Sequence, residues 1–114
     1  MAYCDIISIE RPPVTRGEFL DIERINVISC TTYPDCSYRE RVELSFVPCG
    51  KDGMRYGVDN TKRIVVKLDV ETGYIPFSET ANAMKAALIS KVKNIRNIDI
   101  LIKAFQYRKY YCEV

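Results

Sequence analysis

The sequence predicts an α+β fold in which a mostly antiparallel sheet, or partly rolled sandwich, of about five strands packs against one main helix. Several segments alternate apolar and polar residues with a period of two, and one segment repeats apolar residues at helical spacing. The composition, 47% hydrophobic and 28% charged over 114 residues, is typical of a globular domain with one core. We therefore expect residues 1–114 to form a single domain.

Period-two alternation with many β-branched residues indicates the strands. Val42, Leu44 and Phe46, for example, alternate with Glu43 and Ser45, so one face of this strand should meet the core. The expected strands are residues 3–9, 25–33, 42–47, 64–70 and 98–104.

The second and third strands should form a hairpin, because the turn-type pair Pro34-Asp35 lies between them. A loop centred on this pair places Val42 opposite Val27 and Leu44 opposite Ile25. This register puts apolar residues on one face of both strands, as a half-buried hairpin requires.

Two segments leave alternatives open. Thr15 and Glu18 have capping-box spacing, so residues 16–24 can form a short helix, but residues 19–23 can equally begin a long strand. Residues 48–61 form a long glycine-rich connection that can hold a short strand around residues 54–58. Long loops often carry function, and the candidate residues in this one are Lys51, Asp52, Arg55 and Tyr56.

Residues 79–93 are the expected helix. Ser78 can cap it, Glu79 lies in its first turn and Lys91 in its last, which complements the helix dipole. An apolar stripe at helical spacing should pack on the sheet: Ala81, Met84, Leu88 and Val92. The strand at residues 98–104 should follow the helix and complete the sheet.

Charge is distributed unevenly along the chain. Residues 1–84 have 10 basic and 13 acidic side chains, whereas residues 85–114 have 7 basic and 2 acidic ones. Aromatic residues interleave with the last basic ones, a composition that suits single-stranded nucleic acid or an acidic protein surface. The simpler interpretation is a solvated helix face followed by an edge strand with protective lysines. The candidate contact residues are Lys103, Tyr107, Arg108, Lys109 and Tyr110.

Histidine is absent, which removes the commonest general base and the commonest metal ligand. The five cysteines are an odd number, and Cys30, Cys36 and Cys49 lack the close pairs of common zinc sites. We expect reduced, mostly buried thiols, no metal and no cofactor. Cys49, beside the glycine-rich loop, is the most plausible nucleophile if the protein has one.

Catalytic and phosphate-binding motifs are absent, so we predict no enzyme and no small-molecule substrate. No apolar run reaches membrane-spanning length and the N-terminus has no signal-peptide pattern, so we expect a cytoplasmic protein without membrane contact. The leading function is a small protein-interaction or assembly module that binds another protein or itself, a kind of domain that viruses and mobile elements often encode. Nucleic-acid binding through the C-terminal basic and aromatic residues is the alternative.

Overall fold

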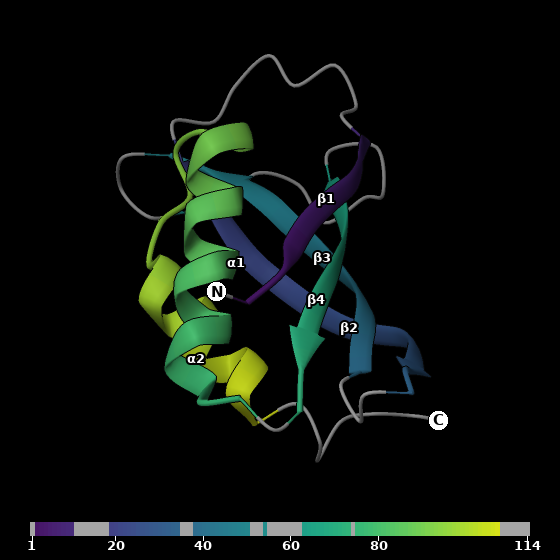
Figure 1. Ribbon diagram of the computed structural model, residues 1–114. Helices are drawn as coiled ribbons and strands as arrows, with labels where there is room; N and C mark the ends of the chain where they lie inside the picture. Colours follow the sequence, from purple (N-terminus) through teal and green to yellow (C-terminus); the bar gives the residue numbers. More distant parts are fainter. Residues whose placement is uncertain are drawn as a thin grey trace.

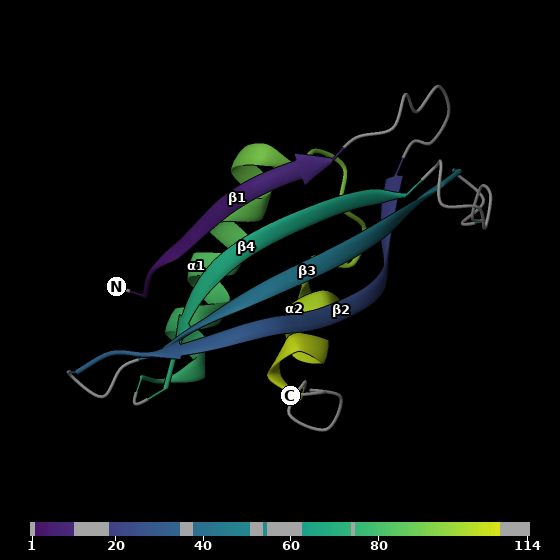
Figure 2. The ribbon, with the colours of Figure 1, turned by 90° about the vertical axis from the view of Figure 1, so that its right-hand side faces the viewer.

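The computed structural model describes residues 2–10, 19–34, 38–50, 54, 63–73 and 75–107. It is an α+β structure with a single four-stranded antiparallel sheet in the order β1-β4-β3-β2. Both helices lie on the same face of this sheet (Figures 1 and 2). In chain order the elements are β1 (Cys4–Glu10), β2 (Phe19–Thr32), β3 (Tyr38–Cys49), β4 (Ile64–Thr72), α1 (Phe77–Lys91) and α2 (Ile98–Gln106).

The β2–β3 hairpin has the register that the alternation predicts. Val27 faces Val42 and Ile25 faces Leu44, so those expectations are confirmed. The pairing extends to Phe19, which shows that residues 19–24 are strand and not helix. Two bulges interrupt β2, one between Ile22 and Arg24 and one beyond Val27. Residues 55–58, where a short strand was expected, lie outside the described residues, as do residues 16–18.

The core lies between the sheet and the two helices. Alternate residues of β3 and β4 point into it, and Leu44 and Leu68 are fully buried. From the expected helical stripe, Met84, Leu88 and Val92 are buried, and Ala81 packs partly against them. The stripe prediction is therefore confirmed.

The start of the helix differs from the prediction. α1 begins at Phe77, two residues earlier than expected, and Pro76 is its N-cap residue. The expected cap at Ser78 is wrong, because Ser78 lies within the first turn. Proline suits this position because the first amides of a helix have no partner within the helix.

The expected strand at residues 98–104 is also wrong, because this segment lies in the second helix, α2. Leu101, Ile102 and Phe105 are buried against the core, a spacing that only a helix brings to one side. Apolar residues at 98, 100 and 102 satisfy period two equally well, so the sequence pattern of this run fits a strand as well as a helix. The described chain therefore has four strands and two helices, and no strand follows α1.

The edge of β2 is partly covered by the segment between the helices. The amide of Leu20 donates to the Asn94 carbonyl at 2.8 Å, and the Arg96 amide donates to the Leu20 carbonyl at 2.8 Å. The Arg96 guanidinium also donates to Asp21 at 3.0 Å. This segment acts as a short parallel addition to the sheet at the start of β2.

Candidate functional site

The structure describes two of the contact residues that the sequence predicts. Lys103 and Tyr107 are exposed and lie four positions apart, so they share the outward face of α2. Ile100 and Ala104, also exposed, belong to the same face. The remaining candidates lie outside the described residues: Arg108, Lys109, Tyr110, Lys51, Asp52, Arg55 and Tyr56.

The described cysteines have different surroundings. Cys49 is fully buried at the end of β3, so a nucleophile there would have no access to a substrate. Cys30 on β2 is exposed. Cys4 on β1 is partly buried, and burial, aided by the negative charges of Asp5 and Asp69, raises its pKa to about 12. A thiol with so high a pKa is a poor nucleophile at neutral pH.

The face of the sheet away from the helices carries charges of both signs. The Arg41 guanidinium lies 3.4 Å from the Asp69 carboxylate, and Arg63 donates to Glu23 at 2.7 Å. The Arg39 guanidinium stacks over the Tyr3 ring at 3.9 Å from its centre. Within the described residues, this face therefore lacks the positive excess that a phosphate backbone requires.

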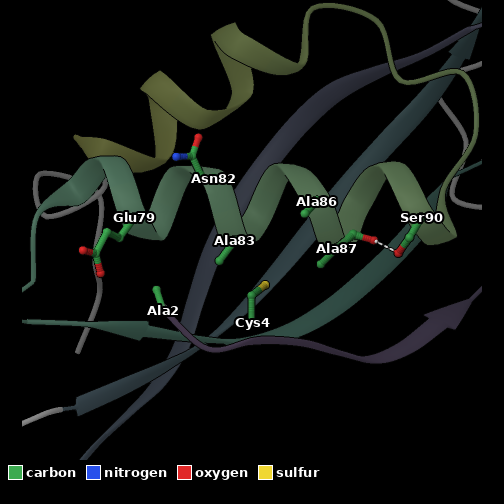
Figure 3. Close-up of a pocket in the computed structure, with 8 residues that line it drawn as sticks. All are labelled: Ala2, Cys4, Glu79, Asn82, Ala83, Ala86, Ala87 and Ser90. Atoms are coloured by element: carbon green, nitrogen blue, oxygen red, sulfur yellow. Dashed lines mark hydrogen bonds between the residues drawn. The ribbon is translucent and has the colours of Figure 1, made fainter.

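A groove with a volume of about 710 Å³ lies between β1 and α1 (Figure 3). Ala83 and Ala87 of α1 point toward the strand, where Ala2 and Cys4 form the opposite wall. The groove exists because these helix residues are too small to fill the space beside the strand. Its lining residues are Ala2, Cys4, Glu79, Asn82, Ala83, Ala86, Ala87 and Ser90.

The groove opens beside an unpaired strand edge. β1 is the outermost strand and pairs only with β4 within the described sheet. The Glu71 amide of β4 donates to the Tyr3 carbonyl at 2.8 Å. Residue pairs across an antiparallel ladder alternate between hydrogen-bonded and non-hydrogen-bonded. The backbone groups of Asp5 therefore also face β4, while those of Cys4 and Ile6 point away from the sheet. These outward groups can bond to an added strand.

The charged side chains of β1 itself are acidic. β1 contains Asp5 and Glu10 and no basic residue, and Glu79 is the charged side chain among the described residues that line the groove. The Arg39 guanidinium of β3 lies over the Tyr3 ring on the face away from the helices. Figure 3 places Glu79 at the end of the groove near Ala2. A strand that binds here therefore meets negative potential from the β1 side and from the helix side.

The sequence alone does not predict this groove. The available signal was the set of alanines at 83, 86 and 87, which makes one side of the helix small. Small residues at helical spacing are compatible with close packing as well as with a groove, and only the position of the helix over the edge strand distinguishes the two.

Neither helix in the described part of the chain has the length and hydropathy needed to cross a membrane. The described residues contain no group of three or more cysteine or acidic side chains placed to hold a metal ion. No family model, no curated protein and no solved structure matches this chain.

Proposed function

We propose that this domain is a protein-interaction module that binds an extended segment of a partner protein as a fifth strand beside β1. The observation that carries the proposal is the combination of an open strand edge with an alanine-lined groove directly beside it. Strand addition of this kind takes affinity from backbone hydrogen bonds and specificity from pockets that receive alternate side chains.

Both requirements have a structural counterpart here. The backbone of Cys4 and Ile6 supplies two donors and two acceptors for the partner. Side chains on the helix side of an added strand would enter the groove against Ala83 and Ala87. Burying apolar side chains there contributes roughly 25 cal/mol for each Å² removed from water, so the groove adds to what the backbone alone provides.

An NMR titration tests the proposal. The ligand is a blocked peptide of roughly seven residues that alternates threonine and valine, and we expect the amide signals of Cys4 and Ile6 to shift on binding. Ala87→Leu should weaken binding at least about tenfold because leucine fills the groove. Ala104→Leu, the same change on the exposed face of α2, is the matched control and should bind as the parent does.

The same variants show whether the partner is a second copy of the chain. Light scattering of the parent would then give a dimer that Ala87→Leu dissociates and Ala104→Leu does not. Shifts that Ala87→Leu leaves unchanged, or that avoid β1 altogether, would contradict strand addition at this edge.

Nucleic-acid binding is a second candidate, favoured by the shared outward face of Lys103 and Tyr107 on α2. A cation and an exposed ring on one helix face can hold a phosphate and stack on a base. Arg108→Glu with Lys109→Glu should then abolish binding to single-stranded oligonucleotides at low salt and leave the thermal melt unchanged. Unchanged binding in a gel-shift assay would place any nucleic-acid site elsewhere.

A further inference from the structure

We propose that the segment bound beside β1 alternates small apolar side chains, which enter the groove, with lysine or arginine, which faces the open side of the sheet. This inference depends on the proposed strand addition and specifies the chemistry of the partner.

The inward positions follow from the walls of the groove. Cys4 and Ala2 on the strand and Ala83 and Ala87 on the helix are short side chains that offer no strong hydrogen-bond donor or acceptor of their own. A polar partner side chain placed between these four residues would lose its water without gaining a partner, which disfavours it there. Glu79 and Ser90 supply polar atoms at the two ends of the groove (Figure 3). Valine and similarly sized apolar residues fit the space without displacing α1.

The outward positions follow from charge. An added strand has its outward side chains beside those of β1 on the same face, and Asp5 lies there opposite Asp69 of β4. Arg41 pairs with Asp69 on the far side, toward β3, so Asp5 is the carboxylate nearest to the open edge. A lysine or arginine next to Asp5 is favourable, whereas an acidic residue is repelled.

The bulge in β1 limits the length of the segment. The register of β1 against β4 shifts between Ile6 and Ser8, and Ile7 is 44% exposed. A bulge bends a strand and disturbs the row of edge groups, so regular pairing should end near Ile6. The groove lies beside the part of β1 before the bulge, where Ala2 and Cys4 line it. The bound segment should therefore be short, with about five residues in contact.

Three blocked peptides of roughly seven residues test the charge selection: valine alternating with lysine, with threonine and with glutamate. We expect the lysine peptide to bind about threefold to fivefold more tightly than the threonine peptide, and the glutamate peptide to bind more weakly still. Asp5→Asn should remove most of the preference for lysine while keeping the threonine peptide bound, because only the charge changes. Ala87→Leu should weaken all peptides, and Ala104→Leu should weaken none.

The outcomes separate the two proposals. If all three peptides bind with equal affinity and Ala87→Leu blocks each, strand addition stands and the charge selection is overturned. If no peptide shifts the Cys4 and Ile6 amides, both are overturned. A lysine preference that persists in Asp5→Asn, or in Ala87→Leu, would show nonspecific attraction to other acidic residues and would overturn the assigned partner chemistry.

Discussion

The two edges of the sheet differ in what the rest of the chain does for them. At β2, the segment between the helices accepts a hydrogen bond from the Leu20 amide and donates one to the Leu20 carbonyl. The Arg96 guanidinium also donates to the Asp21 carboxylate. At β1, the backbone of Cys4 and Ile6 faces outward beside a groove. Within the described residues, no segment bonds to the outer edge of β1 as the segment between the helices bonds to β2. An exposed edge can template further pairing, so the open edge is the place to look for a partner.

This difference follows from the course of the chain after α1. The connection from α1 to α2 passes over the β2 side of the sheet, and α2 then packs its Leu101 and Phe105 into the core (Figure 1). α1 lies toward β1, where its alanines leave space rather than fill it (Figure 3). The start of β2 is therefore covered by backbone hydrogen bonds at Leu20, whereas β1 is flanked by a helix whose small residues leave its edge open within the described residues.

Both edges depend on the shared core, so the largest effect should come from breaking it. Leu44→Asp places an unpaired charge at a fully buried position of β3 and should unfold the domain, with a loss of about 4 kcal/mol or more. Ser45→Asp, on the opposite face of the same strand, should cost less than about 1 kcal/mol. The measurement is a circular-dichroism thermal melt, and a parental melt for Leu44→Asp would refute the assigned core.

Hydrogen exchange compares the edges directly. The Leu20 amide is bonded to the Asn94 carbonyl, whereas the Ile6 amide faces the open edge. We expect the Ile6 amide to exchange at least about 100-fold faster than the Leu20 amide at neutral pH. Equal protection of both amides would mean that β1 is covered in solution.

Each edge strand carries a cysteine, and alkylation followed by mass spectrometry compares these two thiols. Burial raises the pKa of Cys4 from 9.0 to about 12, so its thiolate fraction at pH 8 is lower than that of an ordinary thiol by a factor of about 1,000. A thiolate with a high pKa is a stronger nucleophile, which offsets part of the lower thiolate fraction. Alkylation of Cys4 should therefore be slower than that of an ordinary thiol by about 50-fold.

Cys30 is exposed on β2 and serves as the internal reference. The rate at Cys4 should rise with pH up to about 12, since only the deprotonated thiol reacts. Equal rates for Cys4 and Cys30 at pH 8 would show that Cys4 is not sheltered by the groove wall.

The smallest effect concerns the ion pair at the covered start of β2. Arg96→Ala removes a pair with Asp21, whose side chain is 14% exposed, and should lower the free energy of unfolding by about 1–2 kcal/mol. Lys85→Ala removes a pair with Asp99, whose side chain is 84% exposed, and should cost less than about 0.5 kcal/mol. Urea denaturation measures both. Equal losses would mean that Arg96 does not hold the covering segment in place.

The candidate site could be predicted from the sequence only in part. The alternation around Cys4 and Ile6 identified the strand but not its position at an edge, because strand order depends on contacts between distant residues. The role of Ala83 and Ala87 was likewise hidden, since a small residue on a helix says nothing about what lies opposite. The candidate contact residues Lys103 and Tyr107 were visible in the sequence, yet their common face became clear only when residues 98–106 proved helical.

The sequence by itself determined the α+β class, the hairpin register of β2 and β3, and the buried stripe of α1. Within each of these segments, the spacing of the apolar residues specifies which side chains are buried. The tertiary structure decided the state of residues 98–104, since an apolar run that fits both periods takes whichever form its packing against the core favours. It also decided that the start of β2 is covered and that, within the described residues, the edge of β1 is open. That outcome depends on where the connection after α1 crosses the sheet, and no local pattern of residues specifies that path.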